Sequence, residues 1–321
     1  APKVEYVEAK SRGNFSVSEN GVLVYRSAYS SPSRLVWLDH NGKQVATLGE
    51  PAIYGGMRFS PDGRRLVVAR EDATETGKYD LWLMDVERAS LSRLTFHPAV
   101  GYSAAWSPDG THLAIASLGT KVQIIPANGT GTPVTASSEQ VSAVRDWSSD
   151  GHTIIVQQQN SSTGMDVLSL PVSEKPEGLM PLLNSQFDEI LPRLSPDGHW
   201  LAYMSNESGR GEVYVVPFPG KVGRWQISNN GVTMNVPGVA WSRNGKQLYF
   251  RDAAGGLMVV DVQPQGGEFH SGVPRQIFMA PGGVRPVDEA PDGRILVALE
   301  PEQGFSSPIT LVLNWDVEMK K

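Results

Sequence analysis

Cysteine is absent from the 321 residues of this chain, which excludes disulfides, thiol nucleophiles and cysteine metal ligands. Long apolar runs are absent as well. No stretch approaches the roughly 18 residues that cross a bilayer, and the first residues lack the segments of a signal peptide. We therefore expect no membrane insertion by this segment, while the missing cysteines fit either redox compartment.

A concentrated basic surface is also missing. The formal net charge is −6 and the isoelectric point is near 5.6, and the Lys and Arg residues are scattered along the sequence instead of forming a stripe. Nucleic acids are bound mainly through a concentration of positive charge that neutralises phosphates. Nucleic acid is therefore excluded as an expected partner.

Catalytic sequence motifs are missing too. A kinase needs a glycine-rich phosphate loop, a His-Arg-Asp catalytic loop and an Asp-Phe-Gly, and a serine hydrolase of related architecture needs a Gly-x-Ser-x-Gly elbow. None of these strings occurs, and neither does an Asp-x-Asp-x-Asp calcium loop. We expect neither activity from this chain, and no metal or cofactor.

The six histidines are the remaining candidates for a metal site: His40, His97, His112, His152, His199 and His270. Three of them lie one or two residues after a recurring turn glycine, so a repeat structure would place them in different blades. A zinc site needs ligands that converge. We interpret the histidines as solvated or capping residues.

Turn residues, in contrast, are abundant, with 33 glycines and 23 prolines, and no segment shows a sustained 3.6-residue apolar period. One turn string recurs seven times, with glycines 41 to 48 residues apart, the spacing of four-stranded propeller blades. Proline presets the first corner of a type I turn, aspartate bonds the backbone and glycine accepts a positive φ. The copies end at Gly21, Gly63, Gly110, Gly151, Gly198, Gly245 and Gly293.

Each turn predicts a hairpin between the first two strands of a blade. Large apolar residues stand before five of the turns and suit packing between blades: Phe59, Trp106, Trp147, Leu194 and Trp241. Third strands are legible at residues 35–39, 81–85, 122–126, 167–171, 213–217, 258–261 and 309–314, and weaker fourth strands at 46–48, 93–95, 133–135 and 226–228.

The pattern predicts an all-β, seven-bladed β-propeller that occupies residues 1–321 as a single domain. Its blade turns lie near residues 20–21, 62–63, 109–110, 150–151, 197–198, 244–245 and 292–293. The last unit has three strands, so we expect the N-terminal segment 3–9 to complete the seventh blade and remove the exposed edges. A six-bladed ring with one terminal unit as an extension is the alternative.

These repeats resemble the PD40, or WD40-like, propellers of TolB and of prolyl-oligopeptidase-type peptidases. A closer resemblance lies in the strings at residues 201–219, 12–16 and 308–315. They look like the C-terminal extracytoplasmic propeller of bacterial membrane-bound serine/threonine kinases, common in acidobacteria. The resemblance implies a detached sensor module outside the cytoplasmic membrane, with a cytoplasmic location as the alternative.

Candidate binding residues gather in the connections between the fourth strand of one blade and the first strand of the next. In a propeller these connections surround one mouth of the central channel, where ligands commonly bind. Arginines from four blades, with carboxylates and aromatics, could hold a protein, a peptide or a small polar ligand, because the guanidinium fork suits carboxylates. The alternative, which the ordinary occurrence of charge in loops favours, is that they neutralise one another as channel-lining salt bridges. The predicted site residues are Tyr54, Arg58, Tyr102, Arg145, Asp146, Phe187, Asp188, Glu189, Arg193, Asn235, Arg285 and Asp288.

The sequence thus predicts a non-catalytic ligand- or protein-binding propeller, the sensor of a membrane-bound kinase. One alternative is a TolB-like periplasmic scaffold that binds a partner peptide. Another is a propeller-scaffold lyase or lactonase, which would require at least three metal-type ligands converging on the channel.

Overall fold

The computed structural model describes residues 32–75, 77–97, 99–220, 222–234, 238–265, 268–280 and 282–300, together with the backbone of five short strands outside these ranges. Every regular element in this part of the chain is a β-strand, which confirms the all-β prediction. It contains no helix long and apolar enough to span a membrane. Two compact units divide the chain, residues 32–300 and the two terminal segments 1–31 and 301–321.

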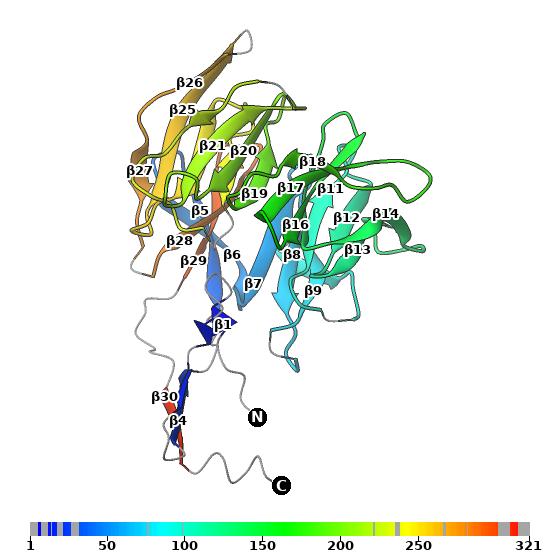
Figure 1. Cartoon of the computed structure of the whole chain (residues 1–321), viewed down its shortest axis with the longest axis vertical. Coiled ribbons are helices and arrows are strands. Elements are labelled where there is room, and N and C mark those ends of the chain that lie inside the picture. Colours follow the sequence, from blue (N-terminus) through cyan, green and yellow to red (C-terminus); the bar gives the residue numbers. More distant parts are fainter. Residues whose placement is uncertain are drawn as a thin grey trace. The chain divides into compact units, whose positions relative to one another are not determined.

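The larger unit consists of six antiparallel blades (Figure 1). Five are continuous in sequence. The first two are β7 to β10 (Tyr54–Phe59, Arg65–Glu71, Tyr79–Asp85, Ser90–Arg93) and β11 to β14 (Ser103–Trp106, His112–Ala116, Thr120–Pro126, Val134–Val141). The next two are β15 to β18 (Ala143–Trp147, Thr153–Asn160, Gly164–Pro171, Met180–Leu183) and β19 to β22 (Glu189–Leu194, Trp200–Ser205, Glu212–Pro217, Trp225–Gln226). The fifth contains β23, β24, β25 and β27 (Val239–Trp241, Gln247–Arg251, Leu257–Gln265, Arg275–Phe278), and β26 (Glu268–Ser271) forms a hairpin on β25.

The sixth blade joins the two ends of this unit. Its first two strands are β28 (Val284–Glu289) and β29 (Ile295–Leu299), and its last two are β5 (Ser33–Leu38) and β6 (Gln44–Ala52). Val297 of β29 lies opposite Val36 of β5, and the blue and orange strands lie side by side in Figure 1. The third strand of the first repeat therefore pairs with the hairpin of the last repeat. The prediction of seven blades is wrong, and the six-bladed alternative is confirmed.

The smaller unit contains the remaining hairpin. β3 (Phe15–Val17) and β4 (Val22–Arg26) form a three-stranded sheet with β30 (Ile309–Leu313) in the order β3, β4, β30. β1 (Tyr6–Val7) pairs with β2 (Arg12–Gly13). The prediction that segment 3–9 closes the ring is therefore wrong, because the described part of that segment pairs locally.

The first strand of each blade, here called the inner strand, contacts the inner strands of both neighbouring blades in the closed sequence β7, β11, β15, β19, β23, β28, β7. The core follows the same circle. Each of six buried apolar clusters spans the interface between two adjacent blades. Within β8, for example, Leu66 and Val68 face one neighbouring blade while Val67 belongs to the cluster on the other side. Alternation along a strand sends successive side chains to opposite faces, which is why these strands are apolar on both faces.

The recurring turn is stabilised by the side chains of its own sequence motif. In the second blade the Ser107 Oγ donates to Asp109 Oδ1 at 2.6 Å and accepts the His112 backbone N–H at 2.9 Å. Asp109 also accepts the Thr111 N–H at 3.0 Å. These hydrogen bonds favour the ionised carboxylate and lower the pKa of Asp109 to about 2. The aspartates of this motif are therefore engaged in the turn itself.

The turns also pack on one another around the ring. A Cβ built on Gly63 would lie 2.3 Å from Pro291 Cδ, and one on Gly110 would lie 3.5 Å from Pro61 Cδ. Gly151 and Gly245 approach the preceding turns at Pro108 and Pro196 in the same way. We call this succession of glycine-to-proline contacts the turn belt. The contact between Gly63 and Pro291 joins the first of these turns to the last, at the point where the sequence ends of the ring meet.

We expect Gly63→Ala to destabilise the protein by more than Gly119→Ala. Both glycines have a positive φ, +70° and +74°, which costs a residue with a Cβ about 1–3 kcal/mol. Only Gly63 also meets another turn, since nothing lies within 4 Å of a Cβ at Gly119. Urea unfolding of the two variants should differ by on the order of 1–2 kcal/mol. Equal losses would contradict the packing role of the belt.

The blade that joins the two ends is testable by cross-linking, since the sequence has no cysteine. Arg34 and Leu299 are paired across β5 and β29. We expect Arg34→Cys with Leu299→Cys to form a disulfide under mild oxidation and to raise the melting temperature, because the bond closes a long loop. The pair Arg34→Cys with Glu87→Cys is the control and should stay reduced. A double variant at 34 and 299 that does not cross-link would exclude this closure.

Candidate functional site

One position on each inner strand, two residues before the first residue of the turn, recurs in all six blades. In order around the ring these residues are Arg58, Ala105, Asp146, Arg193, Ala240 and Asp288. We call the four charged members, Arg58, Asp146, Arg193 and Asp288, the charged layer. All four were predicted from the sequence as site residues. The structure places them on the inner strands and not in the connecting loops.

Arg193 links this layer across blades. Its Nε lies 4.0 Å from Asp146 Oδ2 on one side, and its Nη2 lies 3.5 Å from Asp288 Oδ2 on the other. The Arg193 side chain is 10% exposed, and the Trp241 indole holds its backbone by donating Nε1–H to the Arg193 carbonyl at 3.1 Å. One guanidinium thus stands between two carboxylates from different blades.

Burial weakens the ionisation of these groups. Desolvation raises the pKa of Asp146 to about 7, and the Asp288 charge adds to the increase, although the Leu194 and Trp147 backbone N–H groups donate to Asp146 and oppose it. Desolvation also raises the pKa of Asp288, which Arg193 partly offsets, and lowers the pKa of Arg193. The layer therefore changes charge near neutral pH, mainly at Asp146.

Two nitrogens of the layer are buried without a hydrogen-bond partner, Arg58 Nε and Arg193 Nη1. Arg58 donates Nη1–H to the Met57 carbonyl at 2.8 Å, so one nitrogen of its guanidinium group is hydrogen-bonded within its own strand. Buried donors in folded proteins are nearly always paired. The unpaired nitrogens show that this part of the channel has more donors than the neighbouring side chains satisfy.

Three other predicted residues contact different partners. Arg145 donates Nε–H to Gln157 Oε1, and desolvation lowers its pKa to about 10. Arg285 donates to the Tyr54 carbonyl and to Ser33 Oγ, at 2.8 Å for the latter, and pairs with Glu300 at 3.5 Å. Tyr54 is buried and donates its hydroxyl to the Glu50 carbonyl at 2.7 Å. These residues reinforce blade contacts.

A further group of predicted residues lies between the blades of β17 and β19. Asp188 Oδ1 accepts the Met165 N–H at 2.9 Å, and Glu189 accepts the Ser185 hydroxyl. Phe187 donates its N–H to the same serine.

Two predicted residues remain. Tyr102, directly before β11, donates its hydroxyl to the His97 carbonyl at 3.3 Å. Asn235 lies outside the described residues.

Sequence reasoning missed Arg243, which stands where most turns have proline. Its backbone N–H donates to Glu289 Oε2 at 3.1 Å, and its Nη2–H donates to the Pro61 carbonyl of a different blade. The long side chain therefore ties the turn belt across the channel end. The departure from Ser-Pro-Asp-Gly at Ser242-Arg243-Asn244-Gly245 was the signal that could have found it.

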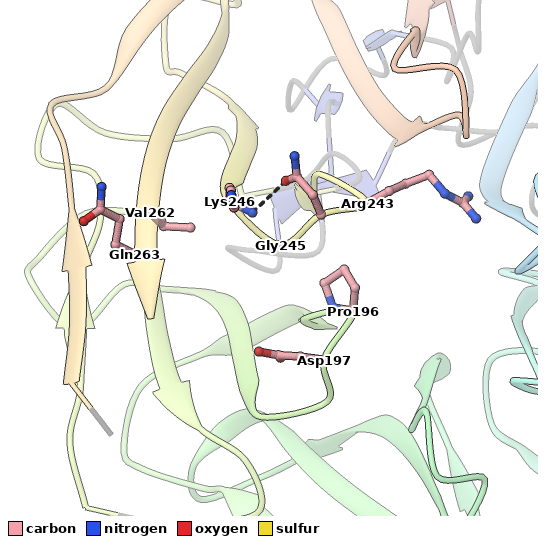
Figure 2. A pocket seen from close by; sticks show the side chains of 8 residues that line it. Pro196, Asp197, Arg243, Gly245, Lys246, Val262 and Gln263 are labelled. Carbon is pink, nitrogen blue, oxygen red and sulfur yellow. Dashed lines mark hydrogen bonds between the residues drawn. The ribbon is translucent and has the colours of Figure 1, made fainter. Parts of the chain in front are cut away.

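A groove of about 650 Å³ lies next to Arg243 on the turn face, between the hairpins of two blades. Figure 2 shows Pro196 and Asp197 on one side, Lys246 on the other, and Arg243 extending away from the groove. Lys246 is exposed. The groove is lined by turn and strand residues that do not include any member of the charged layer, and it provides a second surface against which binding in the channel can be compared.

The histidines do not converge. All six are exposed and belong to different turns or strands, and His270 pairs with Glu268 at 3.4 Å on β26. In the described ranges no group of three or more His, Asp or Glu side chains is arranged to hold a metal ion.

Comparison with known proteins identifies the repeat. The sequence model of the PD40 family, described as the TolB beta propeller domain, matches residues 14–244. A putative TolB from Agrobacterium tumefaciens has a TM-score of 0.60 at 20% identity, covering 85% of this chain and 99% of that one. TolB from Acinetobacter baumannii has a TM-score of 0.56 at 15% identity, covering 87% and 66%. Hydrazine synthase from Kuenenia stuttgartiensis has a TM-score of 0.51 at 15% identity, covering 93% and 94%. At these identities the likeness is one of fold.

The raised pKa of Asp146 predicts how stability depends on pH. A carboxyl whose pKa is about 7 in the folded chain and 3.8 in the reference state binds its proton more tightly when folded, so the free energy of unfolding falls as pH rises from about 4 to 7. Because the side chain is 24% exposed, we expect a change on the order of 1–2 kcal/mol.

Asp146→Asn should remove this part of the pH dependence, as measured by urea unfolding between pH 4 and 8. Asp109→Asn is the matched control, because its carboxyl has a lowered pKa and an asparagine, Asn244, already occupies the equivalent turn position. An Asp146→Asn variant with the wild-type slope would show that Asp146 ionises normally.

Proposed function

Because the chain belongs to the TolB beta propeller domain family, whose sequence model matches residues 14–244, we propose that it is a non-catalytic binding propeller that holds a peptide or small polar ligand in its central channel. The observation that carries this proposal is the charged layer. Arg193 is almost wholly buried between two carboxylates and still has an unpaired nitrogen. A free donor beside two carboxylates is a group that a ligand acceptor can satisfy.

The architecture supports the proposal physically. Rigid β-sheets hold the inner strands on all sides, so a ligand in the channel meets preorganised side chains and little ordering entropy is lost on binding. Ligand sites in proteins are typically concave, with a small number of fixed polar groups. The inner strands provide such groups from several blades at the same depth.

We infer further that the propeller is the extracytoplasmic sensor of a membrane-bound serine/threonine kinase. The support is the resemblance of the string at residues 201–219 to the propellers of such kinases. These residues form most of β20 and β21. Within this string Arg210 pairs with the fully buried Glu212 at 2.7 Å, and its Glu207 pairs with Arg224, which follows the string. These contacts explain the string as a blade-stabilising element, so ligand recognition is assigned to the channel. A scaffold that holds a partner's peptide is the second candidate, and it uses the same channel.

A thermal-shift screen with short peptides of different charge, saccharides and divalent cations tests the proposal. A ligand present at about 100 times its Kd stabilises the folded state by about 2.7 kcal/mol, so we expect a rise in melting temperature of roughly 5 °C. Gly56→Trp should abolish the rise. Gly56 is exposed on inner strand β7, and a Cβ there would meet only the Tyr102 carbonyl oxygen at 3.9 Å, so we expect this position to accept a large side chain that blocks the channel.

Lys121→Trp is the control, since Lys121 is an exposed residue on β13, away from the inner strands. It should keep the full ligand response. A ligand whose effect survives Gly56→Trp binds elsewhere, and a screen without any stabilising peptide or saccharide would contradict the proposed function.

A further inference from the structure

The charged layer repeats itself after half a turn of the ring. In order, its six positions read Arg58, Ala105, Asp146 and then Arg193, Ala240, Asp288. Positions three blades apart face each other in a six-membered ring, so arginine is opposite arginine, alanine opposite alanine and aspartate opposite aspartate. The charges at this depth therefore follow a two-fold pattern, in which positive, neutral and negative positions occur in that order twice around the ring.

The hydrogen bonds follow the same symmetry. Trp106 donates Nε1–H to the Arg58 carbonyl at 3.0 Å, and Trp241 donates to the Arg193 carbonyl at 3.1 Å. The Leu194 N–H donates to Asp146 Oδ2 at 2.8 Å, and the Phe59 N–H donates to Asp288. Each arginine strand is thus fixed by a tryptophan of the next blade, and each aspartate accepts the backbone of the blade that follows.

The register of the inner strands follows the same two-fold pattern. β7, β15, β19 and β28, which carry the charged residues, each have an irregular register immediately before or within two residues of them. β11 and β23, which carry the alanines, pair with their neighbours without a shift. In β19 the irregular segment includes Leu191 at a φ of +55°. Bulges re-aim side chains and occur next to functional sites, and strained residues persist where the surroundings hold them.

The chemistry of the layer indicates what it would bind. Both of its unpartnered buried atoms are donors, one from each of the opposing arginines, so the complementary ligand group is an acceptor. Arg193 reaches Asp288, two blades away, within 3.5 Å, which shows that side chains at this depth meet across the channel. A planar anion can therefore contact guanidinium groups from both sides.

We propose that the charged layer is a carboxylate-binding site in which Arg58 and Arg193, from opposite sides of the channel, share one carboxylate of the ligand, while Asp146 and Asp288 hold Arg193 in place. The inference rests on the proposed function and makes it specific: the ligand is an acidic peptide or another carboxylated molecule. Arg58 and Arg193 are contact residues, and the two aspartates are positioning residues.

The test compares two capped tripeptides, acetyl-Ala-Glu-Ala-amide and acetyl-Ala-Gln-Ala-amide, in titrations of the ¹⁵N-labelled protein followed through the arginine Nε–Hε signals. We expect saturable shifts of the Arg58 and Arg193 signals with the glutamate peptide and none with its glutamine counterpart. Arg193→Gln and Arg58→Gln should each weaken binding at least tenfold. The double variant should lose little more than either single variant, because one carboxylate is shared.

Lys246→Gln, in the separate groove, is the control and should change affinity less than twofold. Arg193→Lys keeps the charge but not the fork and should weaken binding while the fold is retained, as checked by the melting temperature. Arg58→Gln is a second variant that we expect to fold normally, because the side-chain hydrogen bond of Arg58 is to the carbonyl of its own neighbour Met57.

Equal binding of the two peptides would overturn the carboxylate site and leave a charge-independent channel, so the proposed function would stand. A loss of affinity in Lys246→Gln would move the site to the groove and overturn the inference as well. Titrations without shifts for either peptide would also overturn it, while the thermal-shift screen with saccharides and uncharged peptides still decides the proposed function independently.

Discussion

Each blade of this ring has two apolar faces, and neither face can be buried without a neighbouring blade. The six core clusters lie between blades and not within them, so every blade contributes to two clusters. Burial of apolar surface is the main favourable term in folding. An open array would leave one face exposed at each end, and closure removes both exposed faces together. The ring is therefore the condition on which all other features of the larger unit depend.

Closure also fixes what can stand in the channel. The inner strands bring one residue from each blade to the same depth, where water is scarce and charges are costly unless paired. The protein places two arginines and two aspartates there, and burial shifts the pKa values of Asp146, Asp288 and Arg193 toward their neutral forms. Such groups weaken folding compared with apolar residues of similar size, which is consistent with a role in binding.

Local sequence predicted most of the blade strands and the hairpins at the recurring turns, but not the β25–β26 hairpin or the β1–β2 pair. Ser-Pro-Asp-Gly specifies its turn through contacts among its own residues, such as Ser107 with Asp109, and the apolar residues before the turns, including Phe59, do pack between blades, since Phe59 stacks on Trp37 at 5.7 Å. The number of blades was not predictable in this way. β5 and β30 have equally plausible partners in two hairpins, and the choice is made by long-range pairing, which leaves no local signal.

By itself, therefore, the sequence determined the class of fold, the repeat, the turns and the list of charged residues near the inner strands, because these follow from periodicity and from short-range chemistry. Only the tertiary structure decided that β29 pairs with β5, that Arg243 crosses to Pro61, and that Asp146, Arg193 and Asp288 meet while Asp188 and Glu189 do not join them. The reason is physical: which side chains share one depth of a channel depends on the number of blades and on bulges in the inner strands, and both are set by contacts between residues far apart in the chain.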